Sequence, residues 1–147
     1  MRSARTPGLR SLGRDEDGST IVEFALLAPV LIGFLIGIFQ VGISMQAYNA
    51  MRSVTSDTAR YAVVEYQKKN EVTNAALETY AETLGTGTRY NLRSNFDASI
   101  SNATNQRVSG AIEKTMTVTY TPPSVLPMLN FTSYQMSFSR PIFVIDE

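Results

Sequence analysis

Gly18, Ser19 and Glu23 are the residues whose types and spacing point most clearly to chemistry. Glu23 stands five positions after Gly18, directly before an uncharged run from Phe24 to Met51. An ionised carboxylate at the edge of hydrocarbon is unfavourable unless a partner compensates its charge. If a peptidase cuts between Gly18 and Ser19, the new α-amino group of Ser19 comes within about one helical turn of Glu23 and can neutralise it. The alternative is that Glu23 only reaches out to the headgroups at a membrane boundary.

Other candidate chemistry has little support in the sequence. The chain contains no cysteine and no histidine, which removes the usual zinc ligands, the commonest general base and the thiol nucleophile. The run Asp97–Ser101 matches a D-x-S-x-S metal-ion motif but lacks the buried strand that should precede it. A serine with a lysine base such as Lys114 has no spacing motif behind it. We therefore expect no catalysis, no cofactor and no metal, and the net charge of zero gives no reason to expect nucleic acid.

The uncharged run itself predicts a membrane-spanning helix. Its 28 residues would form a helix about 42 Å long, whereas a bilayer core of about 30 Å needs only about 20 residues. Four arginines precede the run, and basic residues near a span tend to stay in the cytoplasm, so the N-terminus is expected inside. Arg52 and Arg60 on the far side weaken this asymmetry without reversing it. A secretory signal peptide is the alternative.

The stretch GSTIVEFALLAPVLIGFLIGIFQVG resembles the N-terminus of the TadE-like minor pilins of the Tad (Flp-type, tight adherence) pilus. This resemblance implies cleavage after Gly18 by a prepilin peptidase at the cytoplasmic face, with Glu23 as the fifth mature residue. Phe24 stands where members of the pilus group often carry tyrosine, and Ser19 as first mature residue argues against an ordinary type IVa pilin. The implied partners are the prepilin peptidase, other major and minor pilins, the inner-membrane pilus assembly platform and membrane lipid.

Three residues inside the run are candidates for helix packing. Pro29 removes a backbone donor and predicts a kink or a locally opened turn near Ala25 to Pro29. Gly33 and Gly37 form a GxxxG face, continued approximately by Gly42, that allows another helix to approach closely.

The remaining sequence predicts a small α+β head on this helix. Apolar residues at spacings of three and four continue the first helix to about Lys68, and Asn70 and Gly85 suggest the start and the stop of a second helix. A single helix to Leu84 is the alternative. Alternation with a period of two then predicts strands over 96–101 and 112–120 and a third from Tyr134. Three or four antiparallel strands should cover the emerging helix, giving a pilin-like fold.

These observations predict a cytoplasmic leader over residues 1–18, a transmembrane and assembly helix over 19–51, and an extracytoplasmic head over 52–147. The expected function is that of a non-catalytic minor pilin in the bacterial cytoplasmic membrane, spanning it once with the head outside, and reaching the pilus or cell surface after assembly. It would take part in pilus assembly and adhesion. A permanently anchored binding domain that never assembles is the alternative, and a soluble protein cut near Tyr48 or Met51 is a third.

Overall fold

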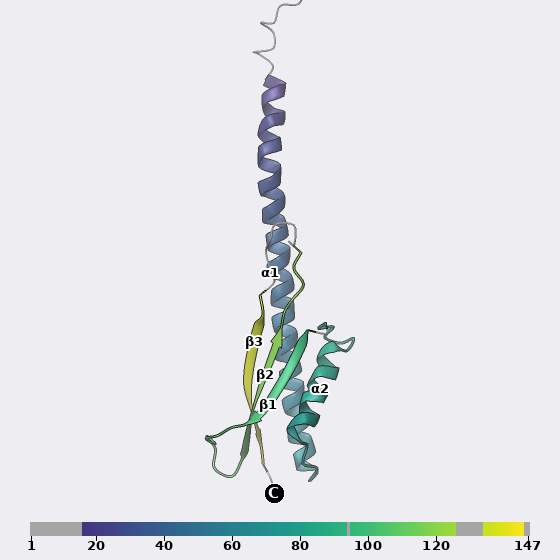
Figure 1. Ribbon diagram of the computed structural model, residues 1–147, viewed down its shortest axis with the longest axis vertical. Coiled ribbons are helices and arrows are strands. Elements are labelled where there is room, and N and C mark those ends of the chain that lie inside the picture. The colour runs from purple at the N-terminus through teal and green to yellow at the C-terminus, as the bar shows by residue number, and fades with distance from the viewer. Residues whose placement is uncertain (1–15, 94, 126–133, 146–147) are drawn as a thin grey trace, which may run out of the picture. The chain divides into compact units, whose positions relative to one another are not determined.

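The computed structural model describes residues 16–93, 95–125 and 134–145 (Figure 1). The elements in this part of the chain are α1 (Glu16–Gln67), α2 (Asn74–Thr86), β1 (Phe96–Asn102), β2 (Ile112–Tyr120) and β3 (Met136–Val144). They form two compact units, Met1–Phe39 and Gln40–Glu147. The predicted α+β class is confirmed, with two separate helices rather than one continuous helix to Leu84 and with three strands.

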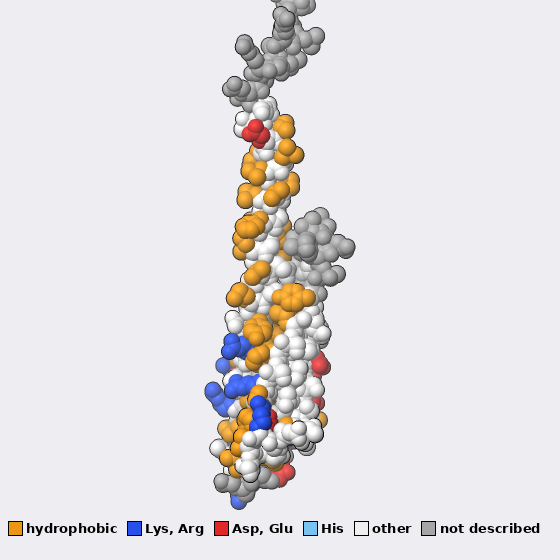
Figure 2. Space-filling model, turned by 90° about the vertical axis from the view of Figure 1, so that its left-hand side faces the viewer, with side chains coloured by type: hydrophobic (Ala, Val, Ile, Leu, Met, Phe, Trp, Pro, Cys, Tyr) orange, Lys and Arg blue, Asp and Glu red, His pale blue; other side chains and the backbone are white. Residues whose placement is uncertain are grey.

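The first unit contains the beginning of α1, which is apolar on every side. Most large apolar side chains between Ile21 and Phe39 are more than half exposed, as Figure 2 shows for one face. A helix that is apolar all round needs a surrounding of lipid or other protein. Within the described residues, α1 is the one helix long and apolar enough to cross a membrane by length and composition. Its helical assignment continues without a break through Pro29.

The second unit begins with the outer part of α1, which ends close to the predicted position. The backbone N–H of Lys69 donates to the Tyr66 carbonyl, and that of Asn70 donates to the Glu65 carbonyl. Lys69 has a φ of 58°, so the two bonds and the left-handed residue form a Schellman cap. The Asn70 side chain also donates to Glu65 Oε2 at 2.8 Å. The predicted role of Asn70 as the cap of the second helix is therefore wrong, because Asn70 closes the first.

The second helix begins and ends slightly later than the sequence suggested. Thr73 is its N-cap, with a hydroxyl that accepts from the Ala76 N–H at 3.2 Å. Gly85 does not stop the helix, because α2 continues to Thr86 and Gly87 is its C-cap. Gly85 is buried, and a Cβ added there would lie 2.6 Å from Cε1 of Phe96. The glycine thus serves close packing of helix on strand.

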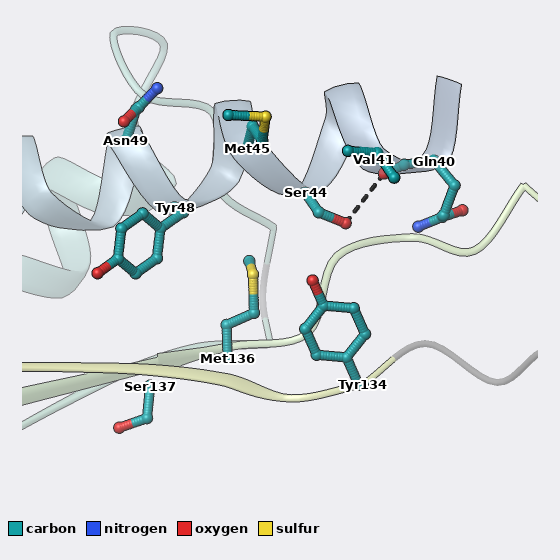
Figure 3. A pocket seen from close by; sticks show the side chains of 9 residues that line it. All are labelled: Gln40, Val41, Ser44, Met45, Tyr48, Asn49, Tyr134, Met136 and Ser137. Carbon is teal, nitrogen blue, oxygen red and sulfur yellow. Dashed lines mark hydrogen bonds between the residues drawn. The ribbon is translucent and has the colours of Figure 1, made fainter. Parts of the chain in front are cut away.

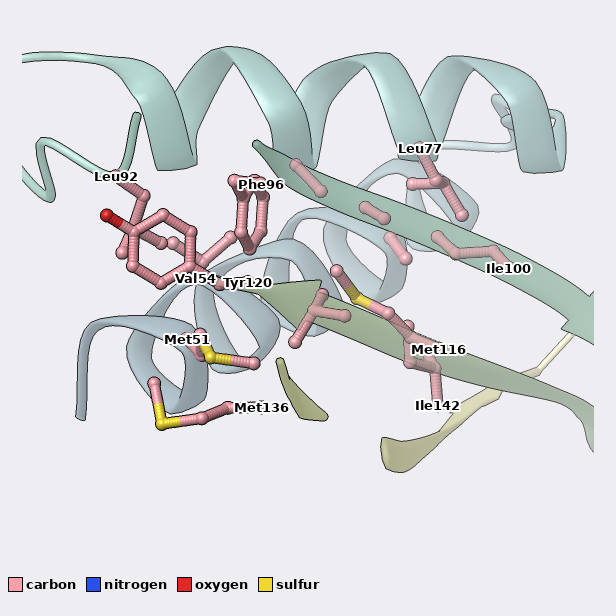
Figure 4. Close-up of a cluster of buried hydrophobic side chains, with 14 of the residues drawn as sticks. Met51, Val54, Leu77, Leu92, Phe96, Ile100, Met116, Tyr120, Met136 and Ile142 are labelled. Carbon is pink, nitrogen blue, oxygen red and sulfur yellow. The ribbon is translucent and has the colours of Figure 1, made fainter. Parts of the chain in front are cut away.

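The three strands form an antiparallel sheet in the order β1-β2-β3. In this register Phe96 faces Tyr120, and Val118 faces Phe138. One face of the sheet packs on the outer part of α1 and on α2, as Figure 4 shows. The side chains of this core that are less than 2 % exposed include Met51, Val54, Leu77, Met116, Val118, Ile142 and Val144. The predicted docking of sheet on helix is confirmed.

The two edges of the sheet are protected from pairing with another strand in different ways. Helix α2 packs against β1, and Glu78 Oε1 accepts from the backbone N–H of Ile100 at 2.6 Å. Strand β3 is the other edge and carries Pro141 opposite Thr115. Proline has no N–H to donate, so it is tolerated on an edge strand.

Candidate functional site

The structure brings Ser19 and Glu23 together on one face of α1. The Ser19 hydroxyl donates to Glu23 Oε1 at 3.3 Å, and both side chains are exposed. A spacing of four residues on a helix gives this contact directly. Among the described residues, no cation pairs with Glu23. The contact in this geometry is thus between the carboxylate and a neutral hydroxyl.

The Gly18–Ser19 peptide bond lies in the first turn of the helix, which begins at Glu16. The N–H groups of a first turn have no acceptor within the helix, so this turn is the easiest part to unwind. Gly18 is exposed, and a Cβ added there would meet no atom within 4 Å. The neighbouring Phe24 side chain is 68 % exposed. This arrangement leaves the bond accessible to another protein.

Pro29, Gly33 and Gly37 lie further along the same apolar stretch. A Cβ added at Gly33 or Gly37 would find nothing within 4 Å, so within the described structure no other element contacts this glycine face. Glycines four residues apart lie on one side of a helix and leave a shallow depression where a second helix can pack. The structure thus leaves the predicted packing face without a partner from its own described residues.

Gln40 is a polar contact that the sequence reasoning missed. Its side-chain amide donates to the Pro123 carbonyl at 3.2 Å and accepts from the Val125 N–H at 2.8 Å. One amide thereby joins the first turn of the second unit to the segment that follows β2. The available signal was an amide side chain directly after the apolar stretch from Phe24 to Phe39.

Lys114 is buried, which the strand pattern did not predict. It lies on the core side of β2 at 5 % exposure. Its ammonium donates to Asn74 Oδ1 at 2.6 Å and lies 5.8 Å from the centre of the Tyr66 ring. This side chain joins the sheet to both helices, and no serine is among its contacts in the described structure.

Glu113 on the opposite face of β2 is also buried, at 3 % exposure. It accepts from Arg107 Nε at 2.8 Å and from the Arg107 backbone N–H at 2.9 Å, and Arg107 Nη2 makes a further contact. The hydrogen bonds from the Arg107 side chain lower the pKa of the Glu113 carboxyl below its usual value. The pair holds the connection between β1 and β2 against the sheet.

The metal-like motif beginning at Asp97 is placed on the surface. Asp97, Ser99 and Ser101 are exposed on the outer face of β1. Among the described residues, no group of three or more acidic, histidine or cysteine side chains is close enough to hold a metal ion.

The apolar N-terminal helix and the small α+β unit have the layout of a pilin-like protein. The family model of the TadE-like proteins matches residues 18–60. Over this segment the chain is similar to the TadE-like proteins. The curated proteins and the solved structures give no match.

Proposed function

We propose that this chain is a minor pilin of a Tad pilus, cleaved after Gly18 and assembled through its first helix. The observation that carries the proposal is the Ser19–Glu23 contact at the start of a helix that is apolar on all sides. The TadE-like match supports it, because that match begins at Gly18.

Cleavage would change the electrostatics at this helix end in two ways. The α-amino group of Ser19 would supply a cation one turn from the Glu23 carboxylate, within the subunit or on a neighbour. Glu23 would also lie closer to the start of the shortened helix, where a negative charge interacts more favourably with the helix dipole. Both effects favour a carboxylate at this position after processing.

Assembly would then replace lipid contacts of the apolar helix by contacts with other pilins. Gly33 and Gly37 offer the face for close approach, Pro29 lies one turn before Gly33, and Glu23 fixes the axial register by pairing with an amine. The prepilin peptidase, the other pilins and the assembly platform of the inner membrane are the partners of this sequence of events. The second unit would be displayed outside the cytoplasmic membrane, where it contacts other pilins or a surface.

Intact-mass measurement of the membrane-extracted protein tests the processing step. We expect a mature chain that begins at Ser19, and full-length precursor when Gly18→Val is introduced. Gly13→Val is the matched control, because it changes a glycine of the same predicted leader and should leave the mature mass unchanged. A native protein that keeps Met1 or Arg2 contradicts the proposal and supports a permanently anchored domain.

Glu23→Gln separates processing from assembly, since it removes the charge and keeps the size. The variant should still be processed but should enter filaments poorly, because the amide no longer attracts the Ser19 amine. Filament fractions probed for this subunit measure the effect, and normal incorporation would refute the electrostatic role of Glu23.

A further inference from the structure

Two adjoining hollows of opposite character lie along α1 and β3 in the second unit. The first has a volume of about 480 Å³ and is largely apolar, with Val41, Met45 and Tyr48 on one side and Tyr134 and Met136 on the other. In Figure 3, Tyr134 and Met136 point toward α1. The second hollow has a volume of about 720 Å³ and is lined by Asn49, Arg52, Ser53, Ser56, Phe138 and Arg140.

The two hollows adjoin each other and are together called the groove. Asn49 lines both of them. Tyr48 of the first and Phe138 of the second meet edge to face, with ring centres 5.8 Å apart. The lining residues of α1 recur at spacings of three and four and therefore share one face of the helix. The groove is apolar at its Val41 end and cationic at its Arg52 end.

The cationic end has the chemistry of an anion site. Among the described residues, neither Arg52 nor Arg140 makes an ion pair, whereas Lys68, Arg89 and Arg107 each do. The Arg52 guanidinium lies 6.0 Å from the centre of the Phe138 ring, and the hydroxyls and amide of this hollow add neutral donors. Arginine presents a planar fork of donors that matches phosphate oxygens.

The dimensions of the groove fit an amphiphile that carries both features. Val41 and Arg52 are separated by about 16 Å along the helix axis, and one leaflet of a bilayer core is about 15 Å thick. The uncharged run of α1, about 42 Å long as a helix, also exceeds the whole core by about 12 Å. Met45 stands in its last third and Val41 just before it, and they are 63 % and 59 % exposed. A bound acyl chain would cover such surplus apolar surface.

We propose that this groove binds an anionic phospholipid, with an acyl chain along Val41, Met45 and Met136 and the phosphate between Arg52 and Arg140. This orientation of the lipid agrees with the sequence, because the residues of α1 at the apolar end of the groove follow directly after the apolar residues 21–39. This proposal goes beyond the pilin function and does not require cleavage after Gly18.

Native mass spectrometry of the full-length chain in a neutral detergent tests the proposal. Phosphatidylglycerol and phosphatidylcholine are added separately at equal concentrations, and the bound fraction is measured for each. We expect phosphatidylglycerol to bind more tightly. The double variant R52Q/R140Q should weaken its binding on the order of thirtyfold, because each basic side chain near an anionic lipid contributes roughly fivefold. Arg93→Gln is the control, since it removes one exposed charge outside the groove and should change nothing.

Several results would overturn the proposal. Equal binding of the two lipids on the unmodified chain would refute the preference for a lipid with a net negative charge, and this comparison needs no variant to fold. Unchanged affinity in the double variant, with an unchanged circular dichroism melt, would do the same. Displacement of the lipid by millimolar inorganic phosphate would indicate a site for a free anion. A protein dimer that forms without lipid and is abolished by R52Q/R140Q would assign the groove to a second copy of the chain.

Discussion

Gly85→Ala should destabilise the second unit, although the same exchange in most helices stabilises a protein. Gly85 is buried where α2 crosses β1. An added Cβ would lie 2.6 Å from Cε1 and 2.8 Å from Cδ1 of Phe96. The Phe96 side chain is itself only 5 % exposed, so its ring cannot turn into solvent without opening the core.

Two opposing terms set the magnitude. Alanine is favoured over glycine inside a helix by about 1 kcal/mol, whereas forcing extra atoms into a packed core costs about 1–3 kcal/mol. We expect a net loss of about 1 kcal/mol for Gly85→Ala. Gly42→Ala is the matched control, because Gly42 also lies in a helix of this unit and its added Cβ meets nothing within 4 Å. The control should gain up to about 1 kcal/mol, so the two variants should differ by about 2 kcal/mol.

Thermal unfolding of the full-length chain in a neutral detergent, followed by circular dichroism, measures this difference. For a unit of this size, 1 kcal/mol corresponds to about 4–8 °C in Tm, and the two variants should therefore melt about 8–16 °C apart. Adding Phe96→Leu to Gly85→Ala should recover part of the loss, since the smaller side chain gives the methyl group room. A Gly85→Ala variant as stable as the Gly42→Ala variant would refute the packing argument.

Two further perturbations test the contacts around the sheet. Met51→Ala should lower the free energy of unfolding by about 2–5 kcal/mol by leaving a cavity, because Met51 is fully buried between α1 and the sheet. Met45→Ala, at a 63 % exposed position, should change the denaturation midpoint little. Equal effects of the two variants would contradict the assigned core. The pKa of Glu113 lies below its ordinary 4.5 in the folded chain, so its stabilising contact with Arg107 is fully present above about pH 4.5 and is lost as the pH falls through the lower folded value. Limited proteolysis of residues 103–111 should therefore accelerate in acid, and Glu113→Gln should already be cleaved faster at neutral pH and show no such acceleration.

The long first helix and the sheet could be predicted because their signals are local. No glycine or proline occurs between residues 43 and 84, and the spacing of Met51, Val54 and Ala62 gives the face that the sheet covers. Alternation in β1 and β2 gives the buried side of each strand. A helix period and a strand period are properties of neighbouring residues, so one sequence suffices to show them.

The exact helix ends and the polar contacts could not be predicted from the period of the apolar residues. Asn70 has a side chain typical of an N-cap, yet it belongs to the C-terminal cap of α1, where its side chain and its backbone N–H both donate to Glu65. Gly85 has the form of a stop signal, yet contact with Phe96 requires it inside α2. Lys114 interrupts the apolar alternation of β2, and its partner Asn74 is 40 positions earlier. The roles of Gly85 and Lys114 follow from tertiary contacts, which local patterns do not contain.

Some contacts of the candidate sites could also be predicted from the sequence, and others could not. Ser19 and Glu23 are four residues apart on one helix, so their spacing places them on one face, where the structure contains a hydroxyl contact. The pairing of Glu23 with a Ser19 amine stays a prediction. The convergence of Arg52 and Arg140 on one hollow could not be predicted, because it joins α1 to the last strand of the sheet.

The protected edges of the sheet restrict how copies of this protein can associate when they are crowded together. Glu78 occupies a donor of β1 that another chain would need, and Pro141 interrupts the row of donors on β3. Strand exchange and runaway cross-β growth are thereby disfavoured, even at the high local concentrations found in a membrane or a fibre. Under the proposed pilin function, polymers of this protein would grow by contacts between helices and between surfaces outside the sheet edges. The sheet would then keep the same hydrogen bonds in the membrane and in the filament.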